Sequence, residues 1–423
     1  MSPASQRLAW VFVPAAAAAC LLLGLIGGAY MDCARSSGAG RIGRSSDFIE
    51  FYTAGRMYRE DKARLYDFSV QYERQKELLR SLGAREQIGP LPFIYPPLVA
   101  AAFSPLARLS YSHAYALWTG ISALIFALSG LALLGRLPLG PAGKVFLSVA
   151  AAAFVPFSVN CLAGGQLATI AFAVFALAYA LLKSGRDASA GAVLALSYYK
   201  PPLFAGYLLL CLLGRRWRLL GGFLAAAATL LLASTACVGA GGVAAYAWKA
   251  LHYRYGHPVM AGYILQMPRS AGLFQALHHV LRGRTWAAEG VYAFCFAAAL
   301  AVGRWLQLKA GTPRRGSAMF DALFAFEVCL SLALSPHLLD YDLTVLLIPM
   351  VLGCCCWLSC APGWSGIFPV LTLAALYTEF AYRRVFLAWA GFQPLTVLLL
   401  FWLCCLGWLL SRLAREPRGC GAG

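Results

Sequence analysis

Long apolar runs constrain this chain more than any other feature of its sequence. Residues 8–30, 112–134 and 219–238 are almost uninterrupted hydrophobic sequence. Each run has the length of about 20 residues that an α-helix needs to cross a bilayer. Backbone groups in lipid must satisfy their hydrogen bonds within the segment, so these crossings are predicted to be helices. The number of such segments predicts an all-α polytopic membrane protein with roughly 11 to 13 crossings.

The composition agrees with a membrane protein and argues against a soluble one. Of the 423 residues, 61% are hydrophobic and 12% are charged, whereas soluble domains are nearer half apolar and a quarter charged. The net charge of +18 comes largely from short loops between apolar runs, namely 136–144, 183–186, 215–218, 304–315 and 412–418. This distribution is the positive-inside pattern. We therefore expect one integral domain over residues 1–423, with the lipid bilayer as its surroundings and no nucleic-acid partner.

The first polar segment, residues 31–93, is predicted to lie outside the cytoplasm. The preceding run, 8–30, follows Arg7 and has no convincing cleavage site, which predicts an uncleaved anchor with its N-terminus inside. Residues 31–93 hold 9 of the 17 acidic residues of the chain. Apolar residues recur there at helical spacing, which predicts two amphipathic helices at the membrane surface. A second long outer loop is predicted over residues 239–289.

Four groups of polar residues interrupt the apolar sequence on the predicted outer side. They are Asp47 with Glu50, Tyr95-Pro96-Pro97, Gly165-Gln166 with Lys200, and Ser335-Pro336-His337 with Asp340 and Asp342. On a helix, Asp47 and Glu50 share a face. Lys200 precedes two prolines within the apolar segment 188–213. This pattern predicts a broken helix with a lysine that faces a cavity or a partner.

The sequence leaves a structural alternative open for most of these side chains. Asp47 could be a helix N-cap, and Lys200 could extend its ammonium group to the membrane interface. Gln166 could form a hydrogen bond between helices, and Tyr95 could be an interfacial aromatic anchor.

Two further residues and one motif have equally plain alternatives. Glu50 could have a structural or surface role, and His337 could be a polar residue at a helix start. The stretch Asp340-Tyr341-Asp342 has the spelling of a metal-binding Asp-x-Asp motif. Its place at a predicted helix start argues against that role, and we expect no metal or other cofactor.

The ordered set of motifs resembles glycosyltransferase family 87, enzymes of the GT-C fold that use polyprenyl-phosphate sugars. The matching residues are Asp47 followed by Tyr52, Leu65-Tyr66-Asp67, Tyr95-Pro96-Pro97-Leu98 with Pro105-Leu106, Gly165-Gln166, Gly191 with Lys200-Pro201, Arg215-Arg216-Trp217 and Ser335-Pro336. Together they extend over roughly residues 40–345. The chain departs from the family where Glu60–Arg64 replaces a glycine before Leu-Tyr-Asp, and where His337–Asp342 replaces a His-rich end. These departures leave the sugar and the acceptor open.

The resemblance implies a multi-pass hexosyltransferase of the cell envelope, with a GT-C-type helical bundle in the inner (plasma) membrane. It would move a hexose, as a mannosyltransferase-like enzyme, from a polyprenyl-phosphate carrier to a hydroxyl of a glycan or glycolipid acceptor at the outer face. Asp47 matches the catalytic acid of the first outer loop, and a single displacement with this general base would invert the anomeric configuration. Substrate-binding residues are predicted to be Glu50, Tyr95 and Gln166, with Lys200, Arg269 and His337 supplying positive charge or hydrogen-bond donors to the leaving phosphate.

Two other functions fit part of the pattern. A transporter or flippase for a lipid-linked or anionic substrate would also use broken helices and an intramembrane lysine. A non-catalytic assembly protein could bind a partner through the acidic outer loop. The absence of a visible inverted repeat argues against the transporter. The enzyme requires Asp47 and Lys200 to face one outer-side cavity that is reachable from lipid, whereas a transporter would place its site near the midplane with alternating access.

Overall fold

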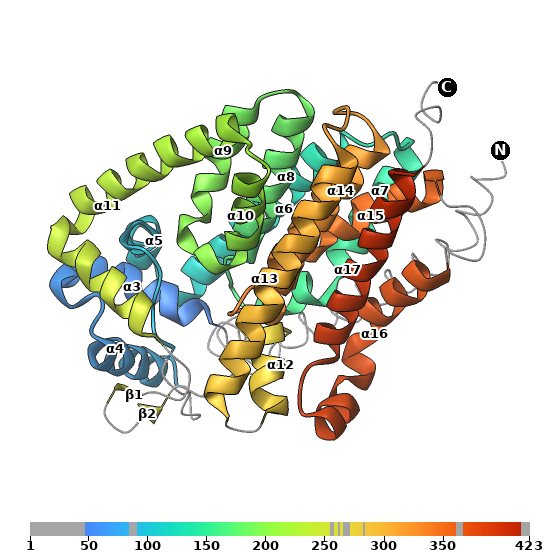
Figure 1. Cartoon of the computed structure of the whole chain (residues 1–423). Helices are drawn as coiled ribbons and strands as arrows, with labels where there is room; N and C mark the ends of the chain where they lie inside the picture. The colour runs from blue at the N-terminus through green and yellow to red at the C-terminus, as the bar shows by residue number, and fades with distance from the viewer. Residues whose placement is uncertain are drawn as a thin grey trace.

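The structure is a computed structural model of the chain, and it is almost entirely helical in the part that it describes. That part comprises residues 47–83, 91–253, 258–260, 263–264, 271–281, 284–360 and 367–415. Within it, strand pairing is confined to a short antiparallel hairpin of β1 (Pro258–Met260) and β2 (Tyr263–Ile264). Figure 1 shows the helices packed into one bundle. The predicted anchor 8–30 lies outside the described residues.

The elements follow in chain order. The first group is α3 (Phe48–Glu60), η1 (Lys62–Arg64), α4 (Phe68–Ser81), α5 (Pro97–Phe103), η2 (Leu106–Arg108), α6 (Tyr111–Leu134), α7 (Pro141–Ala153), η3 (Pro156–Ala163), α8 (Ala168–Lys183), α9 (Asp187–Leu194), η4 (Ala195–Tyr199), η5 (Pro201–Leu203) and α10 (Ala205–Leu213). The second group is α11 (Trp217–His252), α12 (Leu273–Val280), α13 (Thr285–Ala310), α14 (Ala318–Ala333), η6 (Asp340–Leu346), α15 (Leu347–Cys360), α16 (Ile367–Ala390) and α17 (Pro394–Leu413).

Several helices are long and apolar enough to cross a membrane, which confirms the prediction of an all-α polytopic membrane protein. Among the described residues there are five by this criterion, namely α6, α11, α13, α17 and the stretch Asp340–Trp357, and the bent pair α7 and η3 makes a sixth. This count covers the described residues alone, so it leaves out the predicted span 8–30, and it also omits apolar segments that are short or divided. Helix α8 has 16 residues, and residues 188–213 are split into α9, η4, η5 and α10.

The two polar loops fold into further helices. Helices α3 and α4 form within residues 31–93 as predicted, and Figure 1 shows them in blue at the side of the bundle where the hairpin lies. Asp67 caps α4, since its carboxylate accepts hydrogen bonds from the backbone of Ser69 and Val70. The predicted second loop, 239–289, begins at a break in α11, where Gly239 has a φ of 74°. Helix then continues to His252, so the first part of that loop is helical rather than irregular.

An aromatic cluster holds α3 against the bundle. Phe48 and Phe51 are fully buried, and burial of such a side chain stabilises the fold by about 1.5–3 kcal/mol. The Phe48 ring lies 5.6 Å from that of Tyr111 in α6, centroid to centroid. The Phe51 ring lies 5.2 Å from that of Phe103 in α5. These contacts fix the position from which α3 presents its first turn.

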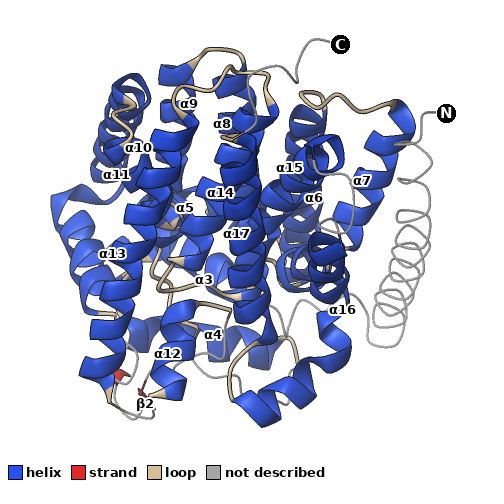
Figure 2. Ribbon diagram, turned by 45° about the vertical axis from the view of Figure 1, so that its right-hand side comes forward, coloured by secondary structure: helices blue, strands red, loops and turns tan. Residues whose placement is uncertain are grey.

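Helix α14 is the central element of the C-terminal half. It packs against α10, α15 and α17, and Figure 2 shows it within the bundle rather than at its edge. Every side chain from Asp321 to Ala333 is buried. The buried carboxylate of Asp321 is paired with Lys183 at 3.1 Å, as a charge removed from water requires.

Candidate active site

The carboxylate of Asp47 is held by another part of the chain and not by its own helix. Asp47 occupies the N-cap position of α3, but its side chain makes no capping hydrogen bond. Instead its Oδ2 accepts a hydrogen bond of 2.7 Å from Nε2 of Gln166. The side chain of Asp47 therefore does not cap α3, contrary to the N-cap alternative. Its hydrogen bond with Gln166 joins two segments that are 119 residues apart.

The turn that carries Gln166 is pressed onto the start of α3. Gly165 has a φ of +71°, and a Cβ there would lie 2.6 Å from Cβ of Phe48. The indole of Trp118 donates a hydrogen bond of 3.0 Å to the carbonyl of Gly165. The hydroxyl of Tyr115 donates one of 2.6 Å to the carbonyl of Ala163. Helix α6 thus anchors the turn from behind, and only glycine fits this left-handed position without strain.

Glu50 lies one turn after Asp47 on the same face of α3 and is buried, with 8% of its surface exposed. Burial raises the pKa of Asp47, while the hydrogen bond from Gln166 and the charge of Lys200 lower it. Burial also raises the pKa of Glu50 well above its usual range, and the neighbouring Asp47 raises it further. Both carboxyl groups therefore hold a proton more readily than exposed ones. A surface role for Glu50 is therefore wrong, whereas a structural role is compatible with its burial.

Lys200 stands at the predicted break between η4 and η5, where its backbone leaves the helical conformation, with φ of −148° and ψ of 70°. The side chain is only 7% exposed. Its Nζ donates to both carboxylate oxygens of Asp342, at 2.8 and 2.7 Å. Nζ also lies 4.7 Å from the centroid of the Tyr341 ring. Because the ammonium group is buried and paired, the alternative of a lysine that reaches for the interface does not hold.

Asp342, the partner of Lys200, is not among the site residues predicted from the sequence. It is fully buried in η6, and its Oδ2 also accepts a hydrogen bond of 2.9 Å from the backbone of Leu339. Asp340 pairs instead with Arg383, so the two carboxylates of the Asp-x-Asp stretch face different cations. One signal could have found the pair, since a lysine and an acid that both interrupt apolar sequence need a partner of opposite charge.

Tyr95 lies close to the same acids. Its ring is stacked on that of Tyr199, with centroids 6.4 Å apart and an interplanar angle of 7°. Its backbone carbonyl accepts a hydrogen bond of 2.9 Å from the hydroxyl of Tyr66. Burial raises the pKa of Tyr95, and the nearby charges of Glu50 and Asp342 raise it further. Tyr95 therefore lies near the carboxyl groups of Glu50 and Asp342. These surroundings differ from those of an interfacial anchor.

Two predicted site residues remain, His337 and Arg269, and the structure describes only the first of them. His337 lies in the segment between α14 and η6, where burial, with a smaller effect from the charge of Lys200, lowers its pKa to about 3. It is therefore neutral at neutral pH and can act there as a hydrogen-bond donor, but not as a cation. Arg269 lies outside the described residues, and its role stays a prediction.

The fold and the site together define a polytopic membrane protein in which buried acids and a buried lysine from distant segments meet. The model of glycosyltransferase family 87 matches residues 93–336, more than half of the chain. The chain belongs to this family and is a glycosyltransferase, which confirms the resemblance and sets aside the transporter and assembly-protein alternatives. Tyr95, Gln166 and Lys200 lie within the matched region, whereas Asp47 precedes it and Asp342 follows it. Comparison with the curated proteins and with the solved structures gives no match.

Proposed function

We propose that this glycosyltransferase moves a hexose, in our interpretation mannose, from a polyprenyl-phosphate carrier to a hydroxyl group of a glycan or glycolipid. The transfer takes place at the outer face of the membrane and inverts the anomeric configuration. The observation that carries the proposal is the carboxylate of Asp47, which Gln166 holds at 2.7 Å within the field of Lys200. The carrier and the sugar are those that the family motifs imply, and the outer side follows from the distribution of Lys and Arg.

Asp47 is the general base in this mechanism. It removes the proton from the acceptor hydroxyl while the oxygen attacks the anomeric carbon, and the bond from that carbon to the phosphate oxygen breaks. A base works best when its pKa approaches the working pH, and burial shifts the pKa of Asp47 in that direction. Glu50, whose pKa is raised further, carries less charge at a given pH and is suited to hydrogen bonding with the sugar.

Lys200 stabilises the leaving group. Negative charge develops on the carrier phosphate as the bond breaks, and a fixed cation in a site without water lowers the energy of that state. The bidentate contact with Asp342 fixes the position of Nζ, so no reorganisation is needed during the reaction. Neutral His337 supplies a hydrogen-bond donor, and Arg269 is a further candidate cation.

The test is transfer of radiolabelled mannose from polyprenyl-phosphate-mannose in membranes that contain wild type, Asp47→Asn or Asp61→Asn. Asp61 directly follows α3 and serves as the matched control in the same loop. We expect Asp47→Asn to reduce transfer by about 10²–10⁴-fold at equal expression, and Asp61→Asn to retain it.

Equal transfer by wild type and Asp47→Asn would remove Asp47 from catalysis. Transfer from polyprenyl-phosphate-glucose but not from the mannose donor would change the sugar and keep the mechanism.

A further inference from the structure

A basic pocket lies at the end of the bundle away from α3 and α4. It has a volume of about 390 Å³ and lies where α9 and α11 begin and where α10 and α13 end, at the top of the bundle in Figure 1. Its charged lining consists of Arg215, Arg216, Arg218, Arg304, Arg315, Asp187 and Glu327. Five guanidinium groups thus face two carboxylates, which leaves an excess of three positive charges. The proposed transfer site uses none of these side chains.

One part of the pocket lining is an ion pair held in a hydrogen-bond network. Arg216 donates to both carboxylate oxygens of Glu327, at 2.8 and 2.5 Å. Gln307 donates to Oε1 of the same carboxylate at 2.8 Å and to the carbonyl of Leu210 at 3.1 Å. Glu327 is 1% exposed. This network joins α10, α13 and α14, and Oε1 of Gln307 also accepts a hydrogen bond of 3.4 Å from Arg304.

The excess charge comes from arginines at the rim. Arg315 is satisfied by Asp187 at 2.8 Å and by the carbonyl of Leu182. Within the described part of the chain, no acidic side chain pairs with Arg215, Arg218 or Arg304. Arg215 has a φ of 54°, the one positive value among the non-glycine residues described. This left-handed conformation ends α10 in a Schellman motif, because the backbone N–H groups of Arg215 and Arg216 donate to the carbonyls of Leu212 and Cys211.

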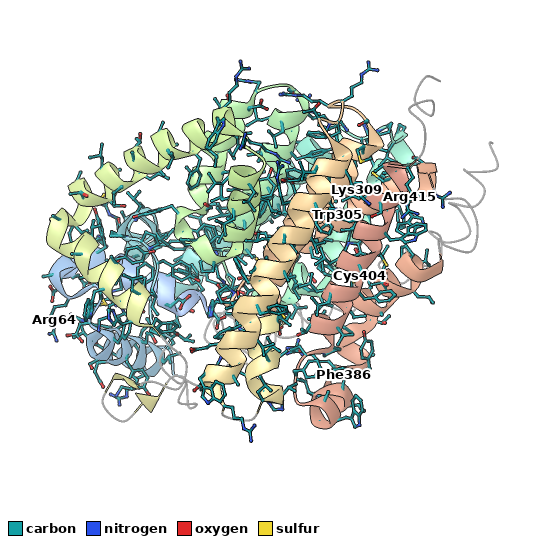
Figure 3. All side chains as sticks on the ribbon, in the orientation of Figure 1. Arg64, Trp305, Lys309, Phe386, Cys404 and Arg415 are labelled. Carbon is teal, nitrogen blue, oxygen red and sulfur yellow. The ribbon has the colours of Figure 1, made fainter. Side chains whose placement is uncertain are left out.

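The surroundings of the pocket belong to a membrane interface. Trp217 and Trp305 are 62% and 48% exposed, and Nζ of Lys309 lies 3.7 Å from the ring of Trp305. Figure 3 shows Trp305 and Lys309 toward the same end of the bundle as Arg415. Tryptophan and lysine are enriched at this depth, where lipid headgroups begin. Leu308, next to Lys309 in the sequence, is an exposed apolar side chain.

We propose that this pocket binds the phosphate group of an anionic phospholipid from the leaflet on its side of the membrane. Guanidinium groups match phosphate through paired N–H donors, and basic pockets between membrane helices are suited to acidic headgroups. The interfacial tryptophans favour a lipid over free phosphate, which shares the same chemistry. The proposal stands apart from the transfer reaction, and neither depends on the other.

The experiment measures the melting temperature of the purified full chain in detergent during titration with phosphatidylglycerol, phosphatidylcholine or inorganic phosphate. A ligand that binds only the folded state raises this temperature. Wild type is compared with Arg215→Gln/Arg218→Gln/Arg304→Gln. The matched control, Arg136→Gln/Arg186→Gln/Arg314→Gln, removes the same charge from residues that do not line the pocket.

We expect saturable stabilisation of wild type and the control by phosphatidylglycerol, but not by phosphatidylcholine. Each rim arginine removed should weaken the apparent affinity by about fivefold, from about 1 kcal/mol per basic residue near an anionic leaflet. If phosphatidylglycerol raised the melting temperature of the two triple variants equally, the pocket would not be the binding site. If inorganic phosphate stabilised wild type as much as phosphatidylglycerol does, the proposal that the ligand is a lipid would be wrong. If the rim variant does not fold, Arg218→Gln alone, at an exposed position, is titrated and must show the same fivefold loss.

Discussion

At the scale of single residues, we expect Gln166 to set the pH range in which Asp47, the proposed base, is deprotonated. Its amide donates to the ionised carboxylate and lowers the pKa of Asp47 against the effect of burial. A base is active when deprotonated, so transfer falls as pH decreases through this pKa. Removal of the hydrogen bond in Gln166→Leu raises the pKa. The acid limb of the pH–rate profile should therefore move to higher pH.

The measurement is the transfer rate as a function of pH for wild type, Gln166→Leu and Asp61→Asn. The alkaline limb should stay in place in all three, and the acid limb should move only in Gln166→Leu. A lower maximal rate with an unmoved acid limb would mean that Gln166 positions another group and does not tune Asp47.

Residue types and their neighbours predicted part of this site but not the contacts within it. Lys200 was found because a lysine among apolar residues and prolines is unusual, and Asp47 because it matches a family position. Asp342 was not assigned, although it is the partner of Lys200. The pair spans 142 residues, and no local pattern states which distant acid meets a given cation.

At the scale of elements, the turn before α8 controls the start of α3. Gly165 has a φ of +71°, and a Cβ there would lie 2.6 Å from Cβ of Phe48. Gly165→Ala must displace Phe48, the neighbour of Asp47, and should destabilise the protein by about 1–3 kcal/mol. Gly130→Ala in α6 is the matched control, because a Cβ added at Gly130 would have nothing within 4 Å. It should be neutral or stabilising by up to about 1 kcal/mol.

Both glycine variants are compared by melting temperature and by transfer. Gly165→Ala should lower both, and Gly130→Ala should lower neither. If Gly165→Ala had the wild-type melting temperature and transfer rate, the contact between this turn and α3 would accommodate the added Cβ without any change at the site.

The elements themselves were predictable to different degrees. The break at Lys200 was predicted, because two prolines cannot continue the preceding helix, and the structure places η4 and η5 there. The helical continuation of α11 to His252 was not, because glycines and polar residues after position 238 indicated a loop. Local composition predicts where a helix is interrupted better than whether it resumes.

At the scale of the whole molecule, the site exists only because five separate segments meet. Asp47 comes from the start of α3, Tyr95 from the segment before α5, Gln166 from the turn before α8, Lys200 from the broken helix and Asp342 from η6. Each segment is irregular or a helix end, which membrane proteins tolerate where the backbone is buried in protein or lines a cavity. The order of the motifs along the chain identified the family, whereas their spatial assembly came from the fold.

The ion pair of Lys200 and Asp342 tests whether this assembly serves stability or chemistry. Both side chains are almost fully buried, 8% and 1% exposed. Removal of one partner leaves an uncompensated buried charge, so Asp342→Asn should destabilise the protein by about 3–5 kcal/mol. An apolar replacement of both partners is often neutral or stabilising, by about 1–4 kcal/mol. The double variant Lys200→Met/Asp342→Leu should therefore melt at or above the wild-type temperature.

The same double variant should fail to transfer sugar, because it lacks the cation that we propose for stabilising the leaving phosphate. Melting temperature and transfer are measured on wild type, Asp342→Asn and the double variant. If the double variant recovered stability but did not transfer sugar, the ion pair would be needed for the reaction and not for the fold. Recovery of both would make the pair structural and leave the phosphate to another cation, of which Arg269 is the predicted one. The two measurements thus distinguish a contribution of this ion pair to the stability of the bundle from a contribution to the reaction.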